Sequence, residues 1–119
     1  MNVLIVEDSL TTSMALEVFV SACGHRPVCV FDGWLDLASA NQWNIDFVLL
    51  DIMLPHANGY ELASLMRENG LRVPIVAITS LDDDPEMRRE CGIDGYLAKP
   101  VSMEGLKAVF QEFQLAGKA

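Results

Sequence analysis

Five polar residues stand at or just past the ends of apolar segments, and their side chains suit one kind of chemistry. Glu7 and Asp8 follow the first apolar segment, Asp51 follows a later one, Thr79 ends another and Lys99 ends the last. Three carboxylates held close together repel one another unless a cation offsets their charge, and Mg²⁺ prefers such oxygen ligands. A lysine and a hydroxyl can hold further anionic oxygens. The set therefore suits a phosphoryl group bound to a carboxylate, with Asp51 as the expected nucleophile.

Short apolar, mostly β-branched segments alternate with segments of helical periodicity along the chain. The predicted strands are residues 2–6, 27–31, 46–50, 74–79 and 95–99. The predicted helices are residues 12–23, 33–40, 59–68, a helix capped by Asp84 with Pro85 in its first turn, and residues 102–115. In the first helix, the spacing places four apolar residues on one side, namely Ala15, Val18, Phe19 and Ala22.

This alternation predicts an α/β fold, a doubly wound (βα)5 flavodoxin-like protein. Its parallel sheet of five strands should have the order 2-1-3-4-5, with helices on both faces. Ligands bind such sheets beyond the carboxyl ends of the strands, where the strand order reverses. Glu7, Asp8 and Asp51 should therefore face one crevice, closed on its other side by Thr79 and Lys99. We expect one domain over residues 1–119, with residues 116–119 as a frayed tail or the start of a linker.

Each of these residues also has a simpler interpretation. A single acid at a strand end is often a helix cap, which applies to Asp51 and to the Glu7-Asp8 pair. Thr79 alone is an ordinary strand residue, and Lys99 alone is a solvated strand end. If the acids were only separate helix caps, nothing would require a lysine followed by a proline at the end of the fifth predicted strand. The conjunction of the five residues therefore favours a single site.

Composition excludes several classes of function. The net charge of −9 argues against direct nucleic-acid binding, which depends on Lys and Arg neutralising phosphates. The sequence contains neither an apolar run of about 18 residues nor a secretion signal, so we expect a cytoplasmic protein without membrane contact. Three cysteines without a CxxC spacing, Cys23, Cys29 and Cys91, are expected to act as small buried hydrophobes.

Four motifs occur in the order and at the spacing of a known family: "LIVEDS", "FVLLDIMLPHANGYEL", "VPIVAITS" and "GIDGYLAKPVS". Through them, nearly the whole chain resembles the receiver domain of bacterial two-component response regulators. The resemblance implies that Asp51 accepts a phosphoryl group from the phosphohistidine of a sensor histidine kinase or a histidine phosphotransfer protein. It also implies bound Mg²⁺, replaceable by Mn²⁺. Asp8 and Asp51 would be direct ligands, Glu7 would act largely through water, and Met53 would contribute its backbone carbonyl.

The same resemblance assigns the remaining site residues. Lys99 is similar to the lysine that contacts the phosphoryl oxygens, and Pro100 to the family's usually cis proline. Thr79 resembles the switch hydroxyl and Tyr96 the aromatic residue that moves with it. Phosphorylation would then change the surface formed by the fourth helix, the fifth strand and the fifth helix, where a downstream target protein or effector domain would bind. The implied oligomeric state is a monomer or a weak, phosphorylation-dependent dimer.

Other functions fit the sequence less well. A phosphoaspartate enzyme of the haloacid-dehalogenase type needs a second aspartate two residues past the nucleophile, where this chain has Met53. In a flavin-binding domain, the acids after the first strand would repel a phosphate. We expect a module that catalyses only its own phosphorylation and dephosphorylation, with a phosphorylation-independent scaffold as the alternative. Because Met53 and Leu81 are apolar beside the site, neither can orient an attacking water, and self-dephosphorylation should be slow.

Overall fold

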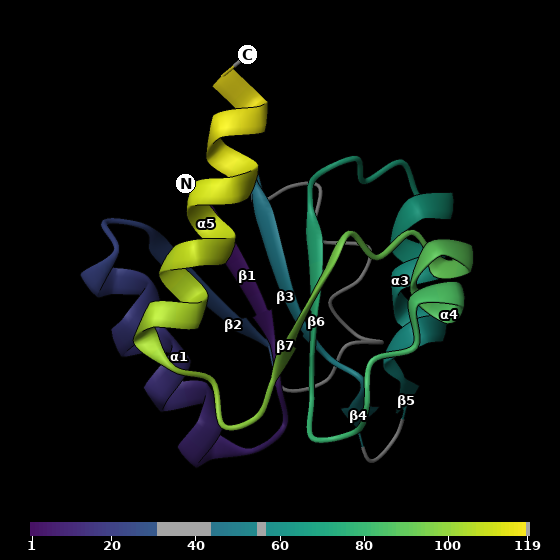
Figure 1. The fold of residues 1–119 in the computed structure, drawn as a ribbon, viewed down its shortest axis with the longest axis horizontal. Helices are drawn as coiled ribbons and strands as arrows, with labels where there is room; N and C mark the ends of the chain where they lie inside the picture. The colour runs from purple at the N-terminus through teal and green to yellow at the C-terminus, as the bar shows by residue number, and fades with distance from the viewer. Residues whose placement is uncertain (31–43, 55–56, 119) are drawn as a thin grey trace.

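A computed structural model describes residues 1–30, 44–54 and 57–118 of the chain (Figure 1). One parallel sheet contains five strands: β1 Asn2–Val6, β2 Arg26–Val30, β3 Phe47–Asp51, β6 Ile75–Thr79 and β7 Gly95–Ala98. Their order across the sheet is β2-β1-β3-β6-β7. Numbered along the chain, these five strands follow the predicted order 2-1-3-4-5. The reversal lies between β1 and β3, as the sequence indicated.

Helices cover both faces of this sheet. They are α1 Leu10–Ala22, α3 Gly59–Glu68, α4 Pro85–Cys91 and α5 Met103–Lys118. Figure 1 shows α1 and α5 on one face and α3 and α4 on the other, which confirms the doubly wound α/β class. The last helix continues three residues beyond the predicted end at residue 115. Of the helices described, none is both long and apolar enough to cross a bilayer.

Some predictions fall on residues outside the described ranges. These are the helix expected at residues 33–40 and the last residue of the strand expected at residues 27–31.

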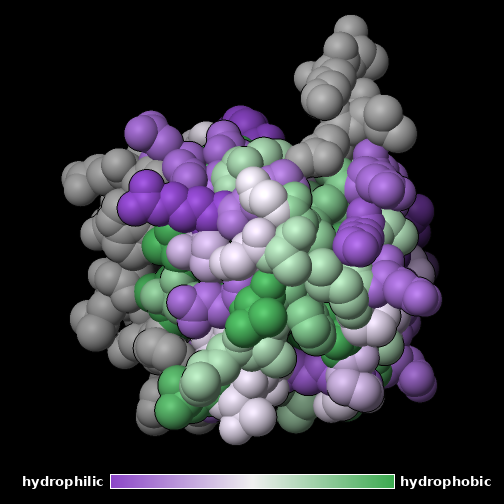
Figure 2. Space-filling view, turned by 90° about the vertical axis from the view of Figure 1, so that its left-hand side faces the viewer, coloured by the Kyte–Doolittle hydropathy of each residue, from purple (hydrophilic) through white to green (hydrophobic). Residues whose placement is uncertain are grey.

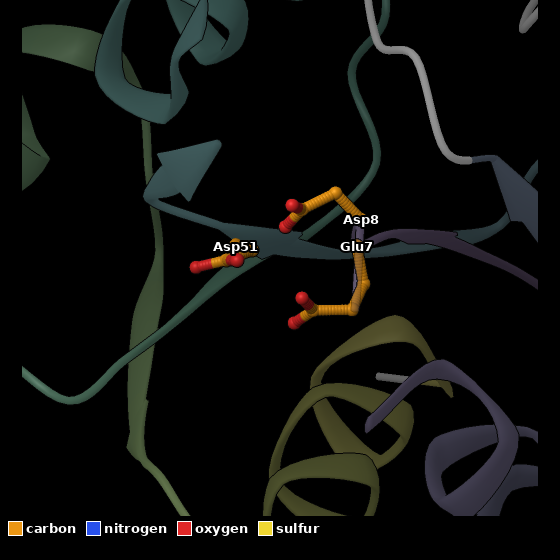
Figure 3. Close-up of side chains that lie close together, drawn as sticks. All are labelled: Glu7, Asp8 and Asp51. Carbon is orange, nitrogen blue, oxygen red and sulfur yellow. The ribbon is translucent and has the colours of Figure 1, made fainter. Parts of the chain in front are cut away.

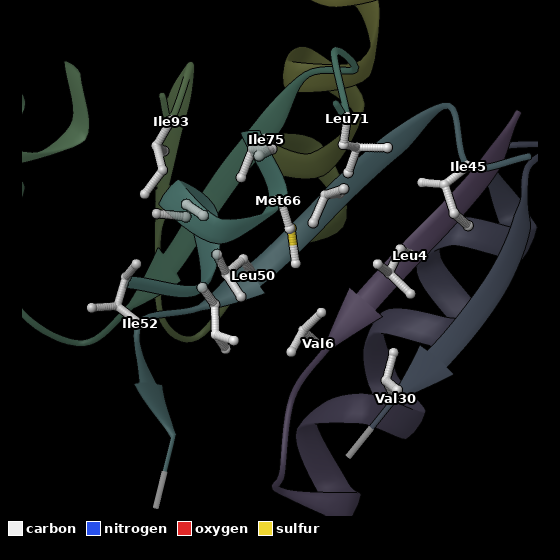
Figure 4. Packing of buried hydrophobic residues seen from close by; sticks show 14 residues of the cluster. Leu4, Val6, Val30, Ile45, Leu50, Ile52, Met66, Leu71, Ile75 and Ile93 are labelled. Atoms are coloured by element: carbon white, nitrogen blue, oxygen red, sulfur yellow. The ribbon is translucent and has the colours of Figure 1, made fainter. Parts of the chain in front are cut away.

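Two apolar cores lie on opposite faces of the sheet because successive strand residues point to opposite sides. Leu4 and Val6 of β1 belong to the core under α3, together with Met66 from that helix. Figure 4 shows these side chains filling the space beside β1 and β3. Val3 and Ile5 belong to the other core, under α1 and α5. The two cores fix the strand ends that carry the site.

The predicted apolar side of the first helix is wrong. Ala15, Val18 and Ala22 are exposed and Phe19 is only partly buried. The residues that α1 buries are Ser13, Leu16 and Val20. Because α1 is apolar around most of its circumference, periodicity alone did not distinguish its buried side from an exposed apolar one.

The helix ends follow the capping rules closely. Ser9 caps α1, and after that helix the amide of His25 donates to the carbonyl of Val20 at 3.2 Å, next to Gly24 in the left-handed conformation. This is a Schellman ending, in which amides of the residues after the helix bind its last carbonyl oxygens. The predicted cap at Asp84 is also confirmed, since its carboxylate accepts from the amide of Met87 at 3.1 Å.

A short hairpin follows β3 and directs the chain into α3. Its strands are β4 Met53–Leu54 and β5 Ala57–Asn58, which the sequence analysis did not predict. The hairpin ends at Gly59, whose amide donates to the carbonyl of Ile52 at 2.9 Å. A Cβ atom at position 59 would lie 2.5 Å from the Cα of Ile52 and 2.6 Å from the carbonyl oxygen of Asp51. Only glycine therefore allows α3 to begin this close to the end of β3.

Candidate functional site

The three acidic residues meet where β1 and β3 end side by side. Val6 of β1 is paired with Leu50 of β3, which places Glu7 and Asp51 next to each other. One carboxylate oxygen from each of Glu7, Asp8 and Asp51 lies within 4.8 Å of the other two (Figure 3). The crevice predicted at the strand reversal thus holds all three carboxylates.

Burial differs sharply among the three acids. Glu7 and Asp51 are 1% and 2% exposed, whereas Asp8 is open to solvent. Two buried carboxylates this close are costly unless a positive charge or hydrogen-bond donors offset them. The cluster is therefore an electrostatically unfavourable arrangement that a cation can relieve.

Lys99 supplies part of the compensating charge. Its ammonium nitrogen lies 2.9 Å from Oε2 of Glu7 and 3.3 Å from Oδ2 of Asp51. Burial by itself would lower the pKa of Lys99, but hydrogen bonding to Glu7 and the charge of Asp51 outweigh it, and the pKa is raised. Lys99 is therefore held firmly in its charged form. Within the described part of the chain, one ammonium facing three carboxylates leaves an excess of negative charge at the site.

The oxygen atoms of Glu7 show where further positive charge fits. Oε1 accepts a hydrogen bond from the amide of Ser9 at 3.1 Å. Oε2 is fully buried, and its one partner among the described residues is the ammonium of Lys99 at 2.9 Å. A buried carboxylate oxygen of this kind and an all-oxygen donor set suit a hard divalent cation such as Mg²⁺. The residues present fit the expected metal.

Asp51 is not a helix cap. Its Oδ1 accepts a hydrogen bond from the amide of Met53 at 3.0 Å, while the N-cap of α3 is Asn58. Its Oδ2 faces Lys99. The amide and the ammonium hold the carboxylate at the end of β3, as a nucleophile requires. The Met53 side chain points to solvent and is 56% exposed.

Thr79 and Tyr96 are linked through one residue, Leu81. The buried Thr79 hydroxyl accepts a hydrogen bond from the amide of Leu81 at 3.0 Å. The Tyr96 hydroxyl donates to the carbonyl of the same residue at 2.9 Å. Among the described residues, no hydrogen bond joins the Thr79 side chain to Asp51. The structure therefore places Thr79 at the neighbouring strand end but with its hydroxyl directed into the loop that leads to α4.

Strand β7 ends directly before Lys99 and places this residue beside the three acidic residues. The amide of Lys99 donates to the carbonyl of Thr79 at 2.9 Å, which continues the pairing of β6 with β7 by one residue. The bond between Lys99 and Pro100 is a cis peptide. Backbone pairing thus fixes the origin of the Lys99 side chain at the same edge of the sheet as Asp51.

Sequence reasoning missed the steric role of Gly59. The sequence identified this residue as the start of a helix, whereas the structure shows that its missing side chain makes room for the backbone of Asp51 and Ile52. The feature of the sequence that could have indicated this role is a glycine eight residues after the predicted nucleophile.

Comparison with known proteins identifies the family. Residues 3–111 match the model of the response regulator receiver domain, so the chain belongs to this family. It is 36% identical to the transcriptional regulatory protein CiaR of Streptococcus pneumoniae over 112 residues, which is 92% of this chain and 50% of CiaR. It is 32% identical to the sensor histidine kinase RcsC of Salmonella typhi, over 94% of this chain and 12% of RcsC. The chain therefore spans at most half of these two relatives.

A solved receiver domain resembles the chain in both sequence and structure. It belongs to the sensor histidine kinase PA1611 of Pseudomonas aeruginosa and was determined with a magnesium ion coordinated in its active-site cleft. It is 34% identical to this chain, with a TM-score of 0.82 over 94% of this chain and 95% of that one. The chemotaxis protein CheY4 of Vibrio cholerae, at 24% identity and a TM-score of 0.88 over 94% of this chain and 97% of that one, shares the fold.

Proposed function

We propose that this receiver domain is switched by Mg²⁺-dependent phosphorylation of Asp51, with residues 1–119 acting as one unit. The observation that carries the proposal is the buried Asp51 carboxylate, held beside two further acids and 3.3 Å from the ammonium of Lys99. The phosphoryl donor would be the phosphohistidine of a sensor histidine kinase or a histidine phosphotransfer protein. The output would reach a downstream target protein or an effector domain.

The metal would be held by the carboxylates of Asp8 and Asp51 and the backbone carbonyl of Met53, with Glu7 acting largely through water. When bound, Mg²⁺ would neutralise charge on the phosphoryl oxygens and on the carboxylates around it. Mn²⁺ has a similar preference for oxygen ligands and would substitute. The three clustered carboxylates, which the single ammonium of Lys99 does not balance among the described residues, support this assignment.

In the transfer step, a carboxylate oxygen of Asp51 attacks phosphorus. The new O–P bond forms as the P–N bond to the donor histidine breaks, and the electron pair of that bond returns to the imidazole. Lys99 would contact a phosphoryl oxygen, because its ammonium already lies beside Oδ2 of Asp51. The contribution of Asp51 and Lys99 is therefore positioning and charge stabilisation, the main sources of rate in phosphoryl transfer.

Phosphorylation would change the loop that leads to α4 through Thr79. To donate to the phosphoryl group, the Thr79 hydroxyl would turn from Leu81, whose amide it now engages. Leu81 also holds the Tyr96 hydroxyl, so a shift of Leu81 would release Tyr96 as well. These two bonds couple the site to the surface of α4, β7 and α5, the proposed output surface.

An exposed apolar stripe on α1 supports docking of a phosphodonor protein beside the site. Leu10, Met14 and Val18 follow one another at four-residue spacing, and each is more than half exposed. Figure 2 shows hydrophobic surface gathered on the face of the molecule that carries α1. A groove of about 360 Å³ separates α1 from the segment of Lys99 and Pro100. A helical donor that covered this stripe would lie next to Lys99.

Treatment with acetyl phosphate tests the proposal. Intact mass spectrometry should detect one added phosphoryl group on the wild-type protein with Mg²⁺, none in chelator and none on Asp51→Asn. A control receiver labelled in parallel shows that the conditions are adequate. Absence of an adduct on the wild type would contradict the proposal and favour a scaffold that acts without phosphorylation.

A further inference from the structure

A groove between α3 and α4 lies apart from the phosphorylation site. It has a volume of about 510 Å³ and opens to solvent where the two helices run side by side (Figure 1). Its lining includes Tyr60, Glu61, Leu65, Glu68, Met87 and Cys91. It shares no residue with the acidic cluster or with the stripe on α1, and it lies on the opposite face of the sheet from α1.

The groove has an apolar floor made by the facing stripes of two helices. Leu65 of α3 faces Met87 and Cys91 of α4, and the last two lie one helical turn apart. Helix α4 buries none of its residues fully, and Met87 is 37% exposed. Apolar side chains on α4 therefore remain partly uncovered in the isolated domain.

The rim of the groove is acidic. Glu61 and Glu68 are exposed, and neither forms an ion pair or hydrogen bond within the described parts of the chain. Burial, followed by the charges of Asp84 and Asp83, raises the pKa of the Tyr60 phenol in the same groove. Negative charge on α3 thus borders an apolar floor, which favours a ligand that is both apolar and cationic.

Two arginines near this rim, Arg88 and Arg67, are engaged elsewhere and do not neutralise it. Arg88 forms an ion pair with Asp83 at 2.6 Å. Arg67 donates to the carbonyl of Gly92 at 2.7 and 3.0 Å and to Asp94 at 2.9 Å. The bonds from Arg67 also tie the turn after α4 to α3, which fixes the end of α4 relative to α3.

We propose that this groove binds a basic amphipathic helix of a partner protein. Glu61 and Glu68 are seven residues apart on one face of α3, a separation of about 10 Å along the helix axis. A partner helix with Lys or Arg at the same seven-residue spacing, and apolar residues between them, would match both the rim and the floor. A second copy of this chain, with its net charge of −9, matches the rim poorly. The interaction needs no phosphorylation of Asp51.

The test is an NMR titration of the unphosphorylated, ¹⁵N-labelled protein with designed helical peptides. One peptide carries leucines between two pairs of lysines at seven-residue spacing, and its matched control carries glutamate in place of each lysine. We expect the lysine peptide to shift amide signals of residues 60–68 and 87–91, and the glutamate peptide to leave them unchanged. Shifts confined to α1, or none at millimolar peptide, would overturn the proposal.

Charge variants test the role of the rim. The double variant Glu61→Gln/Glu68→Gln should bind the lysine peptide about three- to tenfold more weakly, as expected for two exposed ion pairs. The control Glu17→Gln/Glu112→Gln makes the same change in net charge on α1 and α5 and should bind like the wild type. Equal weakening in both variants would show only general electrostatic attraction and would overturn the assignment. Dimerisation through this groove would identify a second copy as the occupant instead.

Discussion

Replacing Asp51 by asparagine should stabilise the protein when no metal is present. The Asp51 carboxylate is almost fully buried beside Glu7 and Asp8, and of the residues that the structure describes only Lys99 opposes their charge. The asparagine side chain would keep the shape and would still accept the hydrogen bond from the amide of Met53, but it would carry no charge. The variant therefore removes the repulsion from Glu7 and Asp8 and the cost of burying a charge. It also removes the attraction to Lys99.

The distances allow an estimate of the net effect. At an effective dielectric constant of about 20, two like charges 4.8 Å apart repel by about 3.5 kcal/mol, whereas Lys99 at 3.3 Å attracts by about 5 kcal/mol. Two carboxylates repel Asp51, although the exposed Asp8 counts for less because solvent screens it. Attraction and repulsion nearly cancel, which leaves the cost of burying the charge. The hydrogen bond from the Met53 amide would be weaker in the variant. With that loss included, we expect Asp51→Asn to raise the free energy of unfolding by about 1–2 kcal/mol.

Urea unfolding followed by circular dichroism measures this difference directly. In chelator, the variant should unfold at higher urea than the wild type. In Mg²⁺ the order should reverse, because a metal that binds only the folded wild type at 100 times its dissociation constant adds about 2.7 kcal/mol. Glu112→Gln, an exposed change of the same charge on α5, should alter neither measurement. A variant that is less stable than the wild type in chelator, or equally stabilised by Mg²⁺, would refute the reasoning.

Three further predictions concern other features of the fold and the site. Gly59→Ala should lower the free energy of unfolding by about 1–3 kcal/mol, measured in urea, because its Cβ would press on the backbone of Asp51 and Ile52. Met53→Asn should shorten the lifetime of the phosphorylated protein, followed by intact mass after the donor is removed, because an amide beside the site can orient a water. Stability should fall as the pH drops below about 6.5, because burial and the Met1 ammonium lower the pKa of His25 and protonation then favours the unfolded chain. His25→Gln should flatten that pH dependence.

Each of these predictions has an outcome that would contradict it. If Gly59→Ala were as stable as the wild type, α3 would be able to move away from β3 without loss of stability, contrary to the prediction. The phosphorylated wild type could have a lifetime of only seconds, or Met53→Asn could fail to shorten that lifetime. Either result would contradict the prediction that apolar residues beside the site slow dephosphorylation. A pH dependence that is unchanged in His25→Gln would assign the loss of stability at lower pH to other groups, most directly the carboxylates.

The sequence predicted most of the sheet because its strands are short apolar segments that end in turn signals. The flavodoxin-like strand order expected from the alternation of strands and helices predicted Glu7, Asp8 and Asp51 at one crevice, where the structure places them. The start of α4 was also readable, because Asp84 and Pro85 are specific to the beginning of a helix.

Other features depend on tertiary contacts that no local pattern encodes. The buried side of α1 was mispredicted because Leu10, Met14 and Val18 make its exposed side as apolar as its buried one. The pairing of Lys99 with Glu7 as well as Asp51 depends on side-chain reach across three strand ends. The closeness of Gly59 to the end of β3 likewise follows from how α3 packs.

Locating the phosphoryl group tests the central claim most directly. Borohydride reduces an aspartyl phosphate to homoserine, so a phosphorylated aspartate can be identified by peptide mass spectrometry. After treatment with acetyl phosphate and Mg²⁺, we expect homoserine at position 51, and none there when chelator replaces the metal. Homoserine at a different aspartate, or at none, would contradict the assignment of Asp51 as the phosphoacceptor.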